Sequence, residues 1–202
     1  ADDGLSREAG ELDSYVEVDG YLMRFDNGEG PFFDDLTKQE LPRLLVKAAR
    51  RKALDHFEEK RVWRQVPMEE ALRTCGRPPI TVRWVDVNKG DKHQPNYRSR
   101  LVAMEIKTDV KPELYAATPP LEALRFLISD MMTKGACGGK KKMMVNDVKR
   151  AYFFAKAKRA IYVEIPAEDR EDGDEHRCGR LNLSMYGTRD AAQNWTEEFT
   201  DT

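Results

Sequence analysis

The sequence predicts an α+β protein with an antiparallel or mixed sheet and packed helices. Strand-like and helix-like segments alternate along the chain, and two strand-like runs at 80–87 and 97–106 flank a turn-rich segment, which predicts a hairpin. Two apolar stripes at helical spacing follow helix-start signals. The chain of 202 residues is long enough to bury a core, in one domain or two small ones.

Residues 1–36 predict a flexible acidic linker with one short strand at 15–18. Residues 1–40 hold twelve Asp/Glu and three Lys/Arg, a net charge of −9. From chain totals of 36 acidic and 34 basic residues, 24 acidic and 31 basic ones are left for residues 41–202, a net charge of +7. This asymmetry favours an acidic tail on a body that binds a polyanion, although a solvated linker explains the head equally well.

A first helix is expected from 37 to about 59. "TKQE" at 37–40 fits a capping box, and an alternative start places Pro42 in the first turn. The apolar stripe of this helix consists of Leu41, Leu44, Leu45 and Ala48, and its exposed basic residues would be Arg50, Arg51 and Lys52. "VWRQVP" at 62–67 predicts a short strand ended by a proline.

A second helix is expected within 117–135, where Thr118 can cap it and Gly135 ends it. Strands are then expected at 141–148, 160–166 and 178–183, and a last helix at 188–199. The three cysteines are odd in number and widely spaced, so a disulfide scaffold is not expected. We see no membrane span or signal peptide, and we expect a soluble protein from a reducing compartment.

One acid stands alone in a basic region. Between Lys134 and Arg159 the chain has nine Lys/Arg and a single carboxylate, Asp147. The residues leave two interpretations open. Asp147 could cap the next turn by accepting backbone N–H bonds, or it could bind a hard cation such as Mg²⁺, which uses one or two carboxylates together with substrate phosphates.

Three segments resemble the reverse transcriptase of copia-type LTR retrotransposons (Pseudoviridae): "YRSRLVAMEI", "DVKRAYFFAKAKRAIYVEIP" and "CGRLNLSMYGTRDAAQNW". That family has, in the same order, K-A-R-L-V-A, D-V-K-x-A-F/Y, I-Y-M/V-E-x-P and L-Y-G-L-K-Q-A-P-R-A-W. The resemblance covers about residues 40–200. It implies a partial right-hand polymerase within 37–202, with fingers at about 37–140 and the start of the palm at 141–202, truncated before the Y-x-D-D hairpin.

The resemblance implies that Asp147 is the first metal-binding, catalytic aspartate of the palm. The backbone carbonyl of Val148 would join it in holding Mg²⁺ (or Mn²⁺) for two-metal phosphoryl transfer. Tyr152 matches the aromatic residue that stacks under the sugar and excludes a ribose 2′-hydroxyl. The alternative for Tyr152 is a core aromatic beside Phe153 and Phe154.

Arg100 resembles the fingers residue that contacts the triphosphate, and Gly187 would allow close backbone approach to the incoming nucleotide. A solvated hairpin face is the alternative for Arg98 and for Arg100, and an ordinary turn glycine is the alternative for Gly187. The residues expected to bind nucleic acid through their charge are Arg98, Lys140, Lys141, Lys142, Lys149 and Arg150.

The chain departs from the family pattern at Asn146, Met104, Asp190 and Ala192, of which the last two replace a glutamine and a proline. No Y-x-D-D follows Asp147, so one carboxylate would have to hold two ions, and we expect the chain by itself to be inactive. The implied function is that of an RNA-directed DNA polymerase fragment.

Its implied partners are an RNA/DNA template–primer, a deoxynucleoside triphosphate and the adjoining integrase and ribonuclease H regions of a polyprotein, with no membrane. The implied location is intracellular, in cytoplasmic virus-like particles and also the nucleus. One alternative is a degenerate, non-catalytic nucleic-acid-binding module. Another, weaker one is a metal-binding module built from His93, Cys137, His176 and Cys178, whose spacing is unusual for zinc.

Overall fold

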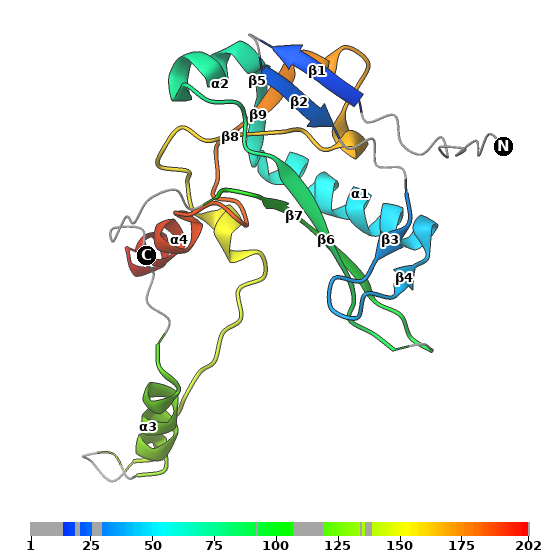
Figure 1. The fold of residues 1–202 in the computed structure, drawn as a ribbon. Helices are drawn as coiled ribbons and strands as arrows, with labels where there is room; N and C mark the ends of the chain where they lie inside the picture. Colours follow the sequence, from blue (N-terminus) through cyan, green and yellow to red (C-terminus); the bar gives the residue numbers. More distant parts are fainter. Residues whose placement is uncertain are drawn as a thin grey trace, which may run out of the picture.

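The computed structural model describes residues 14–18, 21–25, 30–91, 93–106, 119–133, 135 and 139–201. Within these residues the strands are β1 (Ser14–Val18), β2 (Tyr21–Phe25), β3 (Phe32–Phe33), β4 (Glu40–Leu41), β5 (Trp63–Pro67), β6 (Val82–Asn88), β7 (Tyr97–Ala103), β8 (Tyr162–Val163) and β9 (Arg177–Leu181). The helices are α1 (Arg43–Lys60), α2 (Met68–Cys75), α3 (Leu121–Met131) and α4 (Ala191–Thr200), with 3₁₀ turns η2 (Ala151–Phe154), η3 (Ala167–Asp169) and η4 (Asp174–His176) (Figure 1).

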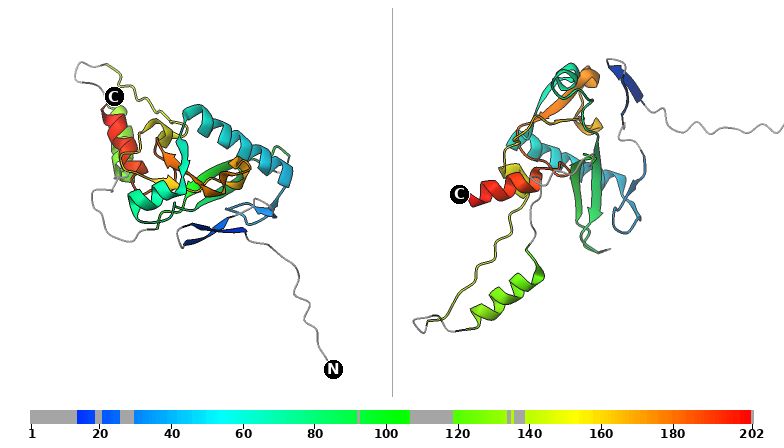
Figure 2. Two further views of the ribbon diagram at one scale, coloured as in Figure 1. Left: turned by 90° about the horizontal axis from the view of Figure 1, so that it is seen from above. Right: turned by 60° about the vertical axis from the view of Figure 1, so that its left-hand side comes forward.

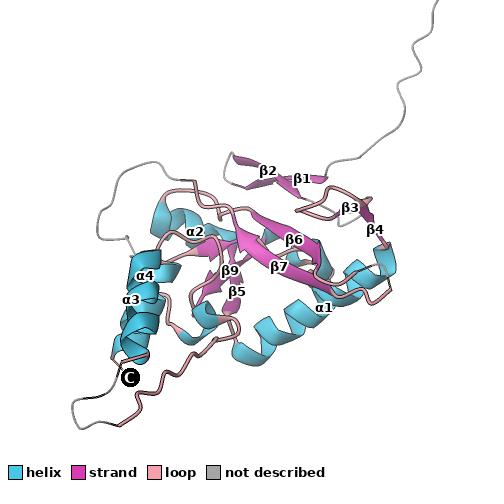
Figure 3. Cartoon of the chain, turned by 90° about the horizontal axis from the view of Figure 1, so that it is seen from below, coloured by secondary structure: helices cyan, strands magenta, loops and turns pink. Residues whose placement is uncertain are grey.

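The described strands form small sheets. β5, β9 and β8 make a three-stranded antiparallel sheet, and β6 and β7 make the predicted hairpin, in which Val82 pairs with Ala103. Among the described residues, one isolated parallel bridge joins Ile80 to Val163. The β6–β7 hairpin lies along α1 (Figure 3). The predicted α+β class with an antiparallel or mixed sheet is therefore confirmed.

The main core lies where α1, β7, β8, β9 and η2 meet. Phe57 of α1 packs edge-on against Phe153 of η2, with ring centroids 4.8 Å apart, and its centroid is also 4.8 Å from that of Trp63. Leu101 of β7 and Met185, which follows β9, are buried in the same cluster. Burial of these aromatic rings is the largest apolar contribution to the stability of this core. It holds η2 in place, and η2 directly follows the segment that carries Asp147.

Residues 30–41 pack on this body. Phe32 and Leu41 are buried together with Val46 of α1. Asp34 accepts hydrogen bonds from the backbone N–H groups of Leu36, Thr37 and Asn88, each at 2.8 Å. These contacts lie partly inside the segment that we assigned to the linker; the boundary at residue 36 and the division into fingers and palm stay predictions.

Arg50, which we expected to be exposed, is buried, and that prediction is wrong. Its guanidinium donates to Asp86 and Glu168, each at 2.6 Å, and lies 4.2 Å from the centroid of the Phe32 ring. Because both carboxylates and the ring come from outside α1, the sequence of the helix alone could not reveal them. Paired in this way, the buried charge ties β3, α1, β6 and η3 together.

Several element boundaries differ from the predictions. Thr37 does not cap the first helix, because Glu40–Leu41 pairs with Phe32–Phe33 as β4 and α1 begins after Pro42. The apolar stripe predicted for the first helix is wrong, because Leu44 and Leu45 are exposed. The helix buries Val46, Ala53, Leu54 and Phe57 instead. The helix α2 was not predicted. The strand expected at 160–166 is reduced to Tyr162–Val163, whereas the strand at 15–18 lies within β1.

The strand expected at 141–148 is wrong, since no described strand pairs with this segment and it has no regular structure. An extended apolar segment becomes a strand only when a neighbour satisfies its backbone groups. The segment connects to α3, which projects away from the sheets (Figures 1 and 2). None of the residues of α3 is buried. The expected cap Thr118 lies outside the described residues.

Candidate functional site

One cleft of about 1140 Å³ lies between α1, β7 and the segment that runs from Asp147 to Phe154. Tyr186 and Trp195 also contribute to its wall. The predicted site residues that line it come from two regions of the sequence about 50 residues apart: Arg98 and Arg100 from β7, and Asp147, Val148, Lys149, Arg150 and Tyr152. The structure thus brings seven of the predicted residues to one concave surface.

Asp147 is exposed and its carboxylate accepts no hydrogen bond from any described residue. The capping interpretation is therefore wrong, because η2 begins after Arg150 without a side-chain cap. The free carboxylate and the neighbouring carbonyl of Val148 are oxygen donors of the kind that Mg²⁺ prefers. The described part of the chain has no group of three or more His, Cys, Asp or Glu suited to a metal. The cleft is lined by two carboxylates, Asp147 and Glu59, and Glu59 contacts His56 at 3.2 Å.

Arg98 and Arg100 lie two residues apart on β7, opposite Val87 and Val85 of β6. Side chains two apart on a strand point to the same face. Both arginines are exposed, whereas Leu101 points into the core. The hairpin therefore presents two guanidinium groups to the cleft and a leucine to the interior.

Tyr152 and Phe153 are adjacent aromatic residues that lie in different environments. Phe153 is 4% exposed and belongs to the core. Tyr152 is half-buried at the cleft, where its ring meets that of Tyr186 edge-on, with centroids 5.1 Å apart. Burial raises the pKa of the Tyr186 hydroxyl above its ordinary value. The two tyrosines form an aromatic edge of the cleft. Tyr186 lies in the segment that resembles L-Y-G-L-K-Q-A-P-R-A-W, but it was not predicted as a site residue.

Gly187 does not line the cleft but holds the turn beside it. Its φ is +83°, and a Cβ at this position would lie 1.9 Å from the carbonyl oxygen of Ala103. The N–H of Ala103 donates to the carbonyl of Tyr186 at 2.8 Å. The close backbone approach that the glycine allows is therefore made to the end of β7; its contact with a nucleotide stays a prediction.

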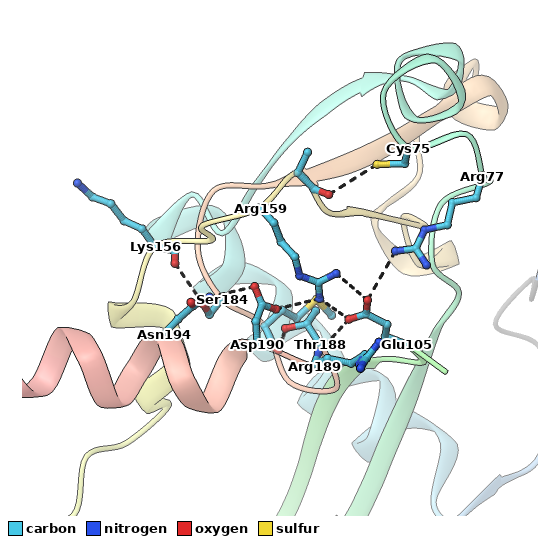
Figure 4. Close-up of polar contacts among 12 residues, drawn as sticks. Cys75, Arg77, Glu105, Lys156, Arg159, Ser184, Thr188, Arg189, Asp190 and Asn194 are labelled. Atoms are coloured by element: carbon cyan, nitrogen blue, oxygen red, sulfur yellow. Dashed lines mark hydrogen bonds and ion pairs between the residues drawn. The ribbon is translucent and has the colours of Figure 1, made fainter. Parts of the chain in front are cut away.

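A buried ionic network holds the same turn in place (Figure 4). Arg159 donates to both carboxylate oxygens of Glu105, at 2.7 and 2.5 Å, and to Asp190 at 3.0 Å. The N–H of Arg189 donates to Glu105 at 2.9 Å, and Asn194 donates to Asp190 at 3.2 Å. Asp190, which replaces the glutamine of the family pattern, is thus a structural partner of Arg159.

The network sets the charge states of its members. Burial alone would raise the pKa of Glu105, but the hydrogen bonds from Arg159 and from the N–H of Arg189 bring it below its ordinary value. The hydrogen bonds that Arg159 donates to Glu105 and Asp190 raise the pKa of Arg159. Glu105 therefore stays a carboxylate at neutral pH although its side chain is only 4% exposed.

The three lysines at 140–142 are not brought to the cleft. Lys141 donates to Asp130 at 2.6 Å and to Thr133 at 3.0 Å, beside α3, and Lys140 and Lys142 are exposed in the same region. Instead, α1 contributes Lys52, His56 and Lys60 to the wall of the cleft. Their spacing of four residues was a readable signal for a common helix face that we did not use.

The zinc alternative finds no support in the described residues, which contain no suitable ligand cluster. Cys178 is fully buried, and burial raises the pKa of its thiol to about 12. Cys137 lies outside the described residues. Among the helices that the structure describes, none is both long and apolar enough to cross a membrane.

Comparison with known proteins gives two findings. The family described as "Reverse transcriptase (RNA-dependent DNA polymerase)" matches residues 61–202, more than half of the chain. The chain is 26% identical over 129 residues to the "Retrovirus-related Pol polyprotein from transposon TNT 1-94" of Nicotiana tabacum, which covers 61% of this chain and 9% of that protein. No solved structure matches. The chain therefore belongs to the reverse transcriptase family.

Proposed function

We propose that the chain is the fingers and the first part of the palm of an RNA-directed DNA polymerase, within the polyprotein of a copia-type retrotransposon. The observation that carries this proposal is the convergence of Arg98, Arg100, Asp147 and Tyr152 on one cleft, inside the region that matches the family. The cleft would hold a template–primer and an incoming deoxynucleoside triphosphate.

In the reaction, the primer 3′-oxygen attacks the α-phosphorus of the triphosphate, the bond to the leaving pyrophosphate breaks, and the 3′-hydroxyl loses its proton. Asp147 and the carbonyl of Val148 would hold Mg²⁺ or Mn²⁺ together with substrate phosphates. When bound, such ions lower the pKa of the attacking hydroxyl and neutralise charge on the phosphates. The other carboxylate that lines the described cleft, Glu59, contacts His56 on α1 at 3.2 Å, so the remaining ligands would have to come from elsewhere in the polyprotein.

The other residues of the cleft bind and orient. Arg100 carries a planar, permanently charged group that suits two phosphate oxygens at once. Tyr152, at the cleft edge against Tyr186, would pack under the sugar of the nucleotide, where a 2′-hydroxyl meets its ring. Arg98, Lys149 and Arg150 would contact backbone phosphates without reading sequence.

A second candidate function is a non-catalytic nucleic-acid-binding module. It is favoured by the excess of basic over acidic residues along the cleft, which gives phosphate affinity without any metal. The two candidates share the surface and differ in the role of Asp147.

Cross-linking tests whether the primer end lies at Asp147. The chain would be irradiated with an RNA–DNA hybrid whose primer 3′ nucleotide is 4-thiothymidine, and the cross-linked peptide would be mapped by mass spectrometry. We expect cross-links within 147–154, beside the free carboxylate. Cross-links confined to α3 or to the surface around η3 and η4 would contradict the proposal.

A further inference from the structure

We propose that one face of α1, formed by Lys52, His56 and Lys60, binds the sugar–phosphate backbone of a nucleic acid strand. The identity of the ligand rests on the proposed function. The three residues follow one another at intervals of four, so they lie on one side of the helix. All three line the cleft that also contains Arg98, Arg100 and the segment from Asp147 to Phe154.

This face is distinct from the buried face of α1. The helix turns Val46, Ala53, Leu54 and Phe57 into the body, together with the paired Arg50. Lys52 is exposed, and Lys60 is half-exposed, with its ammonium group 5.0 Å from the centroid of the Phe154 ring. The apolar stem of Lys60 can rest on this ring while its charge stays at the margin of the cleft.

The lysines of this face differ in their ion pairs from Arg51, which lies on a neighbouring face of the same helix. Arg51 is paired with Asp55 at 2.8 Å and with Glu58 at 2.9 Å. Within the proposed face, His56 contacts Glu59 at 3.2 Å, whereas neither Lys52 nor Lys60 forms an ion pair with any residue that the structure describes. Unpaired ammonium groups along a concave wall attract an anion, whereas paired ones are already neutralised.

The length of the face along the helix indicates which class of anion it can bind. Lys52 and Lys60 are eight residues apart, which is roughly 12 Å along a helix. A single strand advances about 3.4 Å per phosphate, so this distance corresponds to three or four phosphates. The backbone of one strand carries phosphates along this whole distance and can therefore contact both lysines at once.

The salt dependence of binding tests the proposal. The affinity of the chain for a fluorescent RNA–DNA hybrid would be measured over a series of salt concentrations. Lys52→Ala/Lys60→Ala should lower the slope of log K against log salt by roughly 1.8, since each lost phosphate contact removes about 0.9. Lys52→Arg/Lys60→Arg keeps both charges and should keep the slope.

The matched control is Arg43→Ala/Lys47→Ala, which removes two exposed charges from the same helix outside the cleft. It should leave the slope unchanged. An unchanged slope in Lys52→Ala/Lys60→Ala, or an equal fall in the control, would overturn the proposal for α1.

Arg98→Ala/Arg100→Ala, measured in parallel, distinguishes a failure of the inference for α1 from a failure of the proposed nucleic-acid cleft. If this variant lowers the slope while Lys52→Ala/Lys60→Ala does not, the α1 face is wrong and the cleft assignment stands. If neither variant changes the slope, the proposed nucleic-acid cleft is wrong as well, and the inference for α1 fails with it.

Discussion

Arg159 donates to both carboxylate oxygens of Glu105, which lies 54 residues earlier in the chain. The pair joins the segment before β8 to the end of β7, and Asp190 extends it to the turn that carries Tyr186 and Gly187. One buried ionic network therefore sets the aromatic edge of the cleft relative to its β-hairpin wall (Figure 4).

Arg159→Ala should destabilise the fold by about 3 kcal/mol, because it removes the guanidinium that bonds the buried carboxylates of both Glu105 and Asp190. Glu105 then keeps the more distant cation of Arg77, at 3.6 Å. Urea unfolding at neutral pH measures this loss. The control is Arg83→Ala, which breaks the exposed pair with Asp35 and should cost less than about 1 kcal/mol. Equal losses in the two variants would contradict a special role for the network.

The pH dependence of the same pair has a definite sign. The pKa of Glu105 is lowered in the folded state, so its stabilising contribution is present above the unfolded pKa, near 4.5, and is lost as the pH falls through the folded pKa. Wild-type stability should therefore fall below about pH 5 more steeply than that of Arg159→Ala. Parallel curves in urea unfolding would show that Glu105 is not the titrating group.

Glu164 should act in the opposite direction. Burial raises its pKa to about 7 from an ordinary value of 4.5, so ionisation opposes folding and stability is lost as the pH rises from the unfolded to the folded pKa. Glu164→Gln removes this loss and should be more stable than the wild type at pH 8 by about 3 kcal/mol. Thermal unfolding at pH 5 and pH 8 measures the difference, with exposed Glu175→Gln as the control. A pH-independent effect would contradict the assignment.

Gly187→Ala should destabilise the fold by about 3 kcal/mol or more, because its Cβ would meet the carbonyl oxygen of Ala103 and its φ is positive. Gly76→Ala is a matched control, since Gly76 also has a positive φ but an open space around the new Cβ. It should cost only about 1 kcal/mol. If chemical denaturation gives equal costs, contact with β7 does not explain the glycine.

Tyr152→Ala should relax discrimination against ribonucleotides in primer extension by the polymerase region that contains this chain. Truncating the ring opens the space that a 2′-hydroxyl would need. The ratio of deoxynucleotide to ribonucleotide incorporation measures the effect, and Phe199→Ala, which removes an exposed aromatic ring outside the cleft, is the control. An unchanged ratio in Tyr152→Ala would assign the residue to packing alone.

The sequence predicted the elements whose signals are local. The presence of α1, the hairpin of β6 and β7, and the helix after Asp190 could be read from periodicity and turn residues. The face that α1 buries could not, because the predicted stripe residues Leu44 and Leu45 are exposed. α2 was missed although Glu69 and Glu70 in its first turn and Gly76 after its end are helix signals. It spans only eight residues, too few for a clear period.

The remaining features depend on contacts between distant segments. The apolar run at 141–148 reads as a strand, yet pairing needs a neighbour that no local pattern provides. The sequence of the helix does not distinguish Arg50 from an exposed arginine. The residues that surround it, Phe32, Asp86 and Glu168, come from other segments of the chain. The family resemblance predicted Asp147, Arg100 and Tyr152 as site residues. Lys52 and Lys60 could be assigned to the cleft only from the structure, in which α1 lies beside β7.

Primer extension by the polyprotein polymerase region that contains this chain tests the central claim most directly, with Asp147→Asn compared to the wild type and to Asp172→Asn, an exposed acid outside the cleft. Losing a metal-binding carboxylate should lower the extension rate by roughly 1,000-fold, equivalent to about 4 kcal/mol, while hybrid binding stays close to that of the wild type. Asp172→Asn should extend normally. Extension by Asp147→Asn within about tenfold of the wild-type rate would contradict the assignment of Asp147 as a catalytic metal ligand.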